Sequence, residues 1–211
     1  MWLFNKCLLF YVCSPVRYDL NTISQDGYVD PGFQDGLANG PLPPEIAALS
    51  TLNQLRIAGA FLTGTLPSEL DRLEQLTSLD VMGNALSGTL SSQLGNLRNL
   101  DRLELSNNNF SGTLPSELGR LERLFQLNTS HNSISGTLPP QLGNLQNLWS
   151  LDLSGNNFTG TLLSSLGNLK QLYWFRASYN GLSGTLPPSL ANLNNLYELD
   201  LSGNDFTGAL P

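Results

Sequence analysis

Cysteine and histidine are scarce in this chain of 211 residues. Both cysteines, Cys7 and Cys13, lie within the first fifteen residues, so nothing after Ser14 can depend on a disulfide or a thiolate. The single histidine, His131, is the only imidazole that a Ser-His-Asp or Cys-His pair could use, and no Gly-x-Ser-x-Gly segment supplies a nucleophile. A solvated histidine is therefore the favoured interpretation. Phosphate-binding glycine loops, kinase signatures and metal-ligand clusters are also missing, so we expect no enzyme, no catalytic residue, no metal site and no cofactor.

Positive charge is the second deficit. Asp and Glu number 17 against 10 Lys and Arg, which gives a net charge of -7, and only 13% of residues are charged. Nucleic acids and anionic membrane surfaces both require clustered Lys and Arg. The composition therefore predicts that neither is the main partner.

Long apolar runs are confined to the start of the chain. An apolar run from Cys7 to Cys13 precedes small residues and Pro15, as in a secretory signal, although Lys6 interrupts the stretch instead of preceding it. Residues 1–14 are thus a signal peptide, the remnant of an anchor or a wrongly assigned start. No other stretch approaches the roughly 20 residues of a membrane span, so membrane attachment would come only through this segment or through segments outside the sequence.

A 24-residue period organises the rest of the chain. Ser/Thr-Gly-Thr-Leu recurs without an insertion, and a degenerate Gly40-Pro41-Leu42-Pro43 falls on the same register. The glycines of this phrase are Gly64, Gly88, Gly112, Gly136, Gly160 and Gly184, with Gly208 in a variant phrase. We expect an irregular segment with a degenerate first repeat over residues 15–39 and one array over residues 40–211.

Leucine occupies fixed columns of this period, for example Leu79, Leu103 and Leu127. Such columns arise when each repeat is one turn of a coil and buries its apolar face only against its neighbours. The Leu-x-Leu pieces predict strands, and the Leu-Gly-Asn-Leu-x-x-Leu pieces predict a helical or 3₁₀ return. The expected fold is an α/β solenoid, a right-handed curved coil with a parallel concave sheet.

Asparagine fills another column after each strand, from Asn84 through Asn132 to Asn204, with Ala60 in the first turn. An amide can donate and accept at once and so join the backbones of adjacent turns. We interpret this column as a structural ladder.

The segment Leu148-Trp-Ser-Leu-Asp-Leu-Ser-Gly-Asn-Asn-Phe-Thr-Gly-Thr-Leu162 resembles the plant-type leucine-rich repeat, and the resemblance covers roughly residues 40–211. That repeat occurs in receptor-kinase ectodomains, in secreted inhibitors of pectin-degrading enzymes and in their ice-binding relatives. The sequence departs from the pattern in three ways. The paired-cysteine cap is missing, Ser91 and Leu163 replace a proline, and Thr129 and Ala177 replace an aliphatic strand residue. The array also stops at Pro211 in mid-repeat, which predicts a fragment of a longer product.

Two columns are expected on the open face of the concave sheet. The first lies between the strand leucines and reads Arg56, Asp80, Glu104, Asn128, Asp152, Arg176 and Asp200. Acids on adjacent strands about 4.8 Å apart resemble the paired carboxylates of a glycosidase, but an open sheet offers no pocket to raise one pKa. We therefore expect these residues, here named the charge column, to form a solvated, partner-facing stripe.

The second, here named the aromatic column, consists of Phe125, Trp149, Tyr173 and Tyr197, with Trp174 beside it. Large exposed aromatics are frequent anchors of binding surfaces. The alternative is that the rings only pack on one another along the sheet edge. We predict a ligand-binding surface formed by Phe125, Trp149, Asp152, Tyr173, Trp174, Arg176 and Tyr197.

Hydroxyl groups flank each repeated glycine, as Ser111 and Thr113 do around Gly112. If these residues form flat strands, their hydroxyls form a regular lattice of the kind that orders ice. The alternative is that Thr merely suits a strand.

Glycosylation triplets begin at Asn109, Asn128 and Asn157, although a chain so rich in Asn, Ser and Thr contains such triplets by chance.

The sequence therefore predicts a non-enzymatic module that binds a protein or a glycan through its concave face. The resemblance implies a cell-surface receptor ectodomain or a secreted inhibitor, hence an extracellular or cell-surface location. Alternatives are a cytoplasmic repeat scaffold and, less favoured, an ice-binding protein. Oligomeric state is not encoded in any feature of the repeats.

Overall fold

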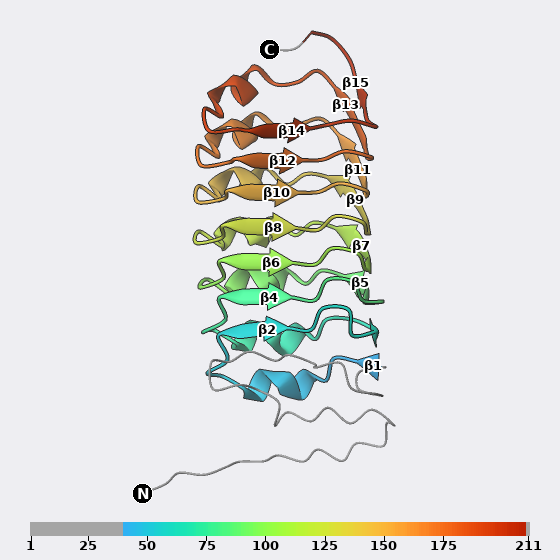
Figure 1. The fold of residues 1–211 in the computed structure, drawn as a ribbon, viewed down its shortest axis with the longest axis vertical. Helices are drawn as coiled ribbons and strands as arrows, with labels where there is room; N and C mark the ends of the chain where they lie inside the picture. Colours follow the sequence, from blue (N-terminus) through green and yellow to red (C-terminus); the bar gives the residue numbers. More distant parts are fainter. Residues whose placement is uncertain (1–39, 210–211) are drawn as a thin grey trace, which may run out of the picture.

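The computed structural model describes residues 40–209, and these residues form one continuous coil (Figure 1). Successive turns stack along the long axis, with the strands of each turn beside those of the next. The expectations for residues 1–14 and 15–39, and for Leu210 and Pro211, lie outside the described residues. The described part confirms the solenoid of 24-residue turns.

One face of the described coil is a seven-stranded parallel sheet, here the main sheet, which corresponds to the predicted concave sheet. Its strands pair at a constant offset of 24 residues, as between Leu79 and Leu103, so each repeat contributes one strand. The predicted Leu-x-Leu strands are confirmed. The strands are β2 (Gln54–Arg56), β4 (Ser78–Asp80), β6 (Arg102–Glu104), β8 (Gln126–Asn128), β10 (Ser150–Asp152), β12 (Trp174–Arg176) and β14 (Glu198–Asp200).

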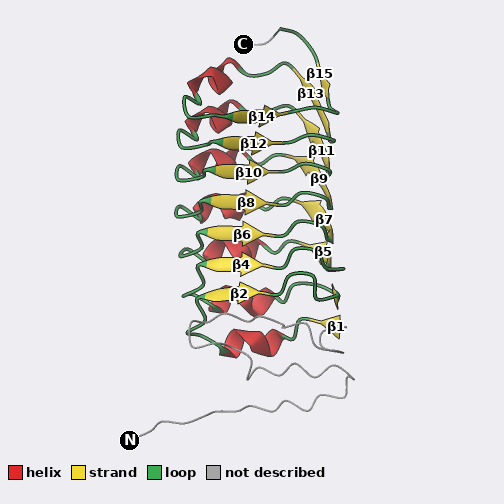
Figure 2. Ribbon diagram, in the orientation of Figure 1, coloured by secondary structure: helices red, strands yellow, loops and turns green. Residues whose placement is uncertain are grey.

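Short 3₁₀ helices form the return path behind the main sheet (Figure 2). They are η2 (Pro44–Ala48), η3 (Ser68–Arg72), η4 (Ser92–Asn96), η5 (Ser116–Arg120), η6 (Pro140–Asn144), η7 (Ser164–Asn168) and η8 (Pro188–Asn192). The predicted Leu-Gly-Asn-Leu-x-x-Leu segment starts at Leu94, and η4 begins two residues earlier, at Ser92. Ser91 is the N-cap of this helix and favours its start there, because the Ser91 side chain accepts the Gln93 N–H at 3.2 Å. In η5 the N-cap is Pro115, whose φ of -64° suits this position.

The leucine columns fill the space between the main sheet and the helices. The middle residues of β4, β6 and β8, namely Leu79, Leu103 and Leu127, have no exposed surface. Adjacent helices approach closely because glycine stands where they meet. A Cβ added to Gly119 of η5 would lie 2.4 Å from the carbonyl oxygen of Gln141 in η6. The core therefore depends on leucine for its volume and on glycine for the spacing of its turns.

A second parallel sheet, which runs along another side of the coil, holds the repeated Ser/Thr-Gly-Thr phrase. Its strands are β5 (Ser87–Thr89), β7 (Asn109–Thr113), β9 (Ser133–Thr137), β11 (Asn157–Gly160), β13 (Gly181–Gly184) and β15 (Asp205–Phe206), and a separate pair is formed by β1 (Gly40–Pro41) and β3 (Leu62–Thr63). From β5 to β15 the strands pair at an offset of 22 residues, so neighbouring phrases are staggered by two residues: Thr113 pairs with Ser135 and not with Thr137.

The stagger keeps hydroxyl residues paired with one another, so ordering of ice by these residues stays a prediction, and the same residues also stack one turn on the next. Gly112 adopts a φ of 74°, which only glycine reaches without strain, and a Cβ there would lie 2.7 Å from the Thr89 Cγ2. The threonine methyl of one turn thus packs over the glycine of the next. The serine of the phrase is also engaged, since the Ser135 hydroxyl donates to the Gly112 carbonyl at 3.2 Å. The repeated Ser/Thr-Gly-Thr residues therefore stabilise the packing of successive turns.

The asparagine ladder is confirmed. The Asn132 Nδ2 donates to the carbonyl of Leu105 in the preceding turn at 3.0 Å and to that of Thr129 in its own turn at 3.1 Å. Its Oδ1 accepts the N–H of Phe110 from the preceding turn at 2.9 Å. Equivalent bonds recur from Asn84 to Asn204. The buried amides thus complete the backbone hydrogen bonds at each bend.

Candidate ligand-binding surface

The open face of the main sheet carries the side chains on either side of each central strand residue, which is leucine in every strand except β12, where it is Phe175. In β10 these are Ser150 and Asp152, because the side chains of a strand alternate between its two faces and Leu151 is fully buried. The backbone ladder extends one residue ahead of the strands, where the Trp149 N–H donates to the Phe125 carbonyl at 2.9 Å. This bond and its equivalents hold the aromatic column in register.

The aromatic column forms one continuous stack of four rings. Centroids of Phe125 and Trp149 lie 5.1 Å apart, those of Trp149 and Tyr173 5.2 Å, and those of Tyr173 and Tyr197 5.0 Å. The angles between neighbouring ring planes are 9°, 11° and 6°. The two inner rings, Trp149 and Tyr173, are therefore covered on both faces by their neighbours. The rings do pack on one another, and their role as anchors of a ligand stays a prediction.

Trp174 leans against this stack from the neighbouring column. Its ring centroid lies 4.3 Å from that of Trp149 at an interplanar angle of 58°, and it makes an edge contact with Tyr173. The residue that pairs with Trp174 in β10 is Ser150, whose small side chain leaves room for the indole. The Arg176 guanidinium lies 5.9 Å from the Trp174 ring centroid, within the range of a cation–π contact.

Arg176 is fixed by a bidentate ion pair. Its Nε donates to Glu198 Oε1 at 2.6 Å and its Nη2 donates to Oε2 at 2.9 Å. These hydrogen bonds raise the pKa of Arg176 and lower the pKa of Glu198. On β10, the other neighbour of β12, the half-buried Asp152 accepts the Ser154 N–H at 3.0 Å. All seven predicted surface residues thus lie on one continuous area that crosses β8 to β14.

The acidic part of the charge column differs from expectation. Asp80 and Glu104 are both buried, with only 4% of each side chain exposed. The Arg102 Nη2 lies between them at 3.9 and 3.8 Å, and Asn128 donates to Glu104 at 3.2 Å. Burial raises the pKa of Glu104, which contradicts the prediction that an open sheet would leave these acids solvated. Long neighbouring side chains cover the sheet and exclude water from them.

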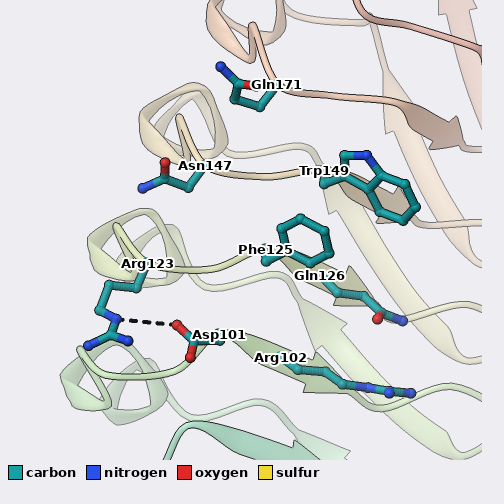
Figure 3. Close-up of a pocket in the computed structure, with 8 residues that line it drawn as sticks. All are labelled: Asp101, Arg102, Arg123, Phe125, Gln126, Asn147, Trp149 and Gln171. Carbon is teal, nitrogen blue, oxygen red and sulfur yellow. Dashed lines mark hydrogen bonds and ion pairs between the residues drawn. The ribbon is translucent and has the colours of Figure 1, made fainter.

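A hollow of about 730 Å³ opens beside the first ring of the stack (Figure 3). It is lined by Asp101, Arg102, Arg123, Phe125, Gln126, Asn147, Trp149 and Gln171. At its edge the Arg123 Nε donates to Asp101 Oδ1 at 3.2 Å. Sequence reasoning found its aromatic wall but missed Arg123, Asn147 and Gln171, which share one repeat position two residues ahead of the aromatic column and so could have been found as a polar column.

The three glycosylation triplets occupy different environments. Asn109 and Asn157 are exposed at the starts of β7 and β11 in the second sheet. Asn128 lies in the main sheet, where its Nδ2 donates to Glu104 and its Oδ1 accepts the Ser130 N–H at 2.9 Å. Because a glycan is attached to this nitrogen, the folded geometry argues against modification of Asn128.

His131 is exposed at a bend, in the left-handed conformation with a φ of 53°. Within residues 40–209 no group of three His, Cys, Asp or Glu side chains is placed to hold a metal ion. None of the helices in this described range has the length and apolar character needed to cross a bilayer.

The model of the Leucine Rich Repeat family matches residues 75–97, 99–121, 123–145, 147–169, 171–193 and 195–211. The chain belongs to the leucine-rich-repeat family. No curated protein matches the chain significantly.

The ectodomain of the plant membrane receptor kinase GASSHO1/SCHENGEN3 from Arabidopsis thaliana, in complex with CASPARIAN STRIP INTEGRITY FACTOR 2, is 40% identical over 80% of this chain, with a TM-score of 0.79. A TDR receptor is 38% identical over 82% of the chain, with a TM-score of 0.81. The Arabidopsis receptor kinase HAESA, in complex with the peptide hormone IDA and the co-receptor SERK1, is 32% identical over 82%, with a TM-score of 0.79. These likenesses confirm the plant-type, receptor-like character of the repeats. The chain spans 20%, 30% and 29% of those three structures.

Proposed function

We propose that this chain is the ligand-binding part of a non-enzymatic, receptor-like protein at the cell surface, and that it binds a peptide or protein across the main sheet. Support comes from the similar structures, which are receptor ectodomains, two of them in complex with CASPARIAN STRIP INTEGRITY FACTOR 2 and with the peptide hormone IDA. Further support comes from the surface itself, because it gathers aromatic and charged groups where the repeat requires neither.

The observation that carries the proposal is the four-ring stack on the open face of the main sheet. The core beneath it is complete without the rings, since Leu127, Leu151 and Phe175 of β8, β10 and β12 are fully buried. Phe125 remains 48% exposed and Tyr197 73%. Exposed, mutually braced rings present a large contact area with little conformational entropy to lose on binding.

The geometry of the stack favours a peptide or protein over a glycan. Sugars bind aromatic side chains by packing C–H groups on an open ring face, where the ring quadrupole is negative. In Trp149 and Tyr173 both faces are covered by neighbouring rings, so mainly their edges are available. The three distances of 5.0–5.2 Å between neighbouring ring centroids give the stack a length of about 15 Å, which matches roughly five residues of extended peptide.

Asp152 and the Arg176–Glu198 pair would then act at the rim of the contact. The pair is already satisfied within the chain, so it offers an oriented pattern of charge instead of a free ion. Charged groups of this kind affect orientation and association rate more than affinity.

Alanine variants of Trp149 and Tyr173 test the proposal against ligands selected from a displayed peptide library. Removing a central anchor is expected to lower affinity at least thirtyfold, about 2 kcal/mol, by biolayer interferometry. Tyr179→Ala is the control, because Tyr179 is an exposed aromatic residue at a bend, outside the main sheet. If both variants lose stability and still bind with the parent affinity, the stack is structural and the proposal fails.

We propose glycans at Asn109 and Asn157, where they would leave the main sheet free. The test is the electrophoretic mobility of the protein from its native source before and after glycosidase treatment. A shift that Asn109→Gln and Asn157→Gln together abolish supports an extracellular location. An unmodified protein would favour the cytoplasmic scaffold instead.

A further inference from the structure

The aromatic column ends at Phe125, although the backbone that supports it continues. The Phe125 N–H donates to the Asp101 carbonyl at 2.7 Å, and the Asp101 N–H donates to the Thr77 carbonyl at 2.7 Å. These bonds repeat those beneath the rings, so Asp101 occupies the place in its turn that a ring occupies in the next four. One more ring at this place would lie about 5 Å below Phe125, at the spacing of the existing stack.

Asp101 leaves that place open. Its side chain is short, and its carboxylate is paired with the Arg123 Nε at 3.2 Å, at the edge of the hollow (Figure 3). Phe125 keeps one face against Trp149 and remains 48% exposed, and it forms one wall of the hollow of about 730 Å³. The face of Phe125 that Trp149 does not cover therefore lies at the open hollow, where the repeat pattern would place another ring.

The charges around the hollow are already paired. Arg123 is bonded to Asp101, and Arg102 lies within 4 Å of both Asp80 and Glu104. A basic side chain would meet two guanidinium groups, and an acidic one would have to compete with carboxylates already in place. The remaining lining is neutral and consists of the rings of Phe125 and Trp149 and the amides of Gln126, Asn147 and Gln171.

We propose that this hollow binds the aromatic side chain of a peptide ligand, whose ring continues the stack over Phe125. The proposal rests on the proposed function and specifies one residue class of its ligand. Parallel aromatic contacts add to apolar burial by an amount equal to about twofold to tenfold in affinity, so an aromatic side chain is preferred over an aliphatic one. The amides at the rim suit the peptide groups or a phenolic hydroxyl on either side of the ring.

The hollow is tested alone with N-acetyl-tyrosinamide, N-acetyl-leucinamide and methyl β-glucoside, titrated into the ¹⁵N-labelled full chain and followed by NMR. We expect the tyrosine probe to bind at least fivefold more tightly than the leucine probe and to shift the amide resonances of Asp101, Phe125 and Gln126. Equal affinities for tyrosine and leucine, or stronger binding of the glucoside, would overturn the proposal.

Asp101→Phe fills the open place with the chain's own ring and is expected to weaken the tyrosine probe at least tenfold. Asn53→Phe adds a ring at the same repeat position two turns away, outside the hollow, and should bind within twofold of the parent. Undiminished binding by Asp101→Phe would refute the inference. If Asp101→Phe does not fold, the test is made with Phe125→Leu. This variant keeps the apolar volume but should abolish the preference of the hollow for the tyrosine probe over the leucine probe.

These outcomes separate the inference from the proposed function. Library peptides that need Trp149 but lack an aromatic residue, or that still bind Asp101→Phe, would support the binding surface and refute the aromatic anchor. If the tyrosine probe binds but no peptide ligand can be selected from the library, the result would support aromatic binding in the hollow and count against the proposed function.

Discussion

Replacement of Asn132 by alanine measures the contribution of the ladder to stability. The change removes the acceptor of the buried Phe110 N–H, 2.9 Å away, and the donor to the carbonyls of Leu105 and Thr129. The carbonyls are only partly deprived, because Leu105 still accepts from Asn108 at 3.1 Å and Thr129 from Asn156 at 2.9 Å. The main cost is therefore one unpaired buried N–H, about 1–3 kcal/mol.

The assay is urea denaturation followed by circular dichroism, with the free energy of unfolding taken from the midpoint and the slope. Asn109→Ala is the matched control, because Asn109 is exposed one strand position before Phe110 and should change stability by less than about 0.5 kcal/mol. An Asn132→Ala variant with the midpoint and slope of the parent would show that the ladder bonds add nothing beyond solvation.

Two further changes test the interior and the charge column. Thr129 is fully buried, and its hydroxyl has no hydrogen-bond partner among the described residues, so Thr129→Val should raise the free energy of unfolding by about 1 kcal/mol in the same assay, and a loss of stability would mean that the hydroxyl is satisfied. Glu104 has a pKa raised by burial above the ordinary 4.5, so the folded state binds its proton more tightly than the unfolded state. Its contribution to stability is therefore fully present below pH 4.5 and is lost as pH rises through the raised pKa. Subtracting the pH–stability curve of Glu104→Gln from that of the parent should give a difference that falls with rising pH over this interval, and a flat or rising difference would contradict the assigned shift.

Much of the fold follows from the sequence because the repeat is local and periodic. Residues 24 apart must stack. The column of Leu103 therefore predicted the core, that of Asn132 the ladder, and that of Trp149 the aromatic surface. The positions of the seven predicted surface residues on one face follow from the same argument. Their role in binding stays a prediction.

The features that the sequence could not decide depend on side-chain contacts between turns. The period alone does not reveal the two-residue stagger of the second sheet, which arises where Thr89 packs over Gly112. Nor does it reveal that Arg102 covers Asp80 and Glu104, or that the ion pair of Arg123 with Asp101 borders a hollow beside Phe125. The sequence by itself determined which residues share a column, because that depends only on the period. Only the tertiary structure decided which of them are covered and which remain open, because burial depends on the conformations of long side chains from three or more turns at once.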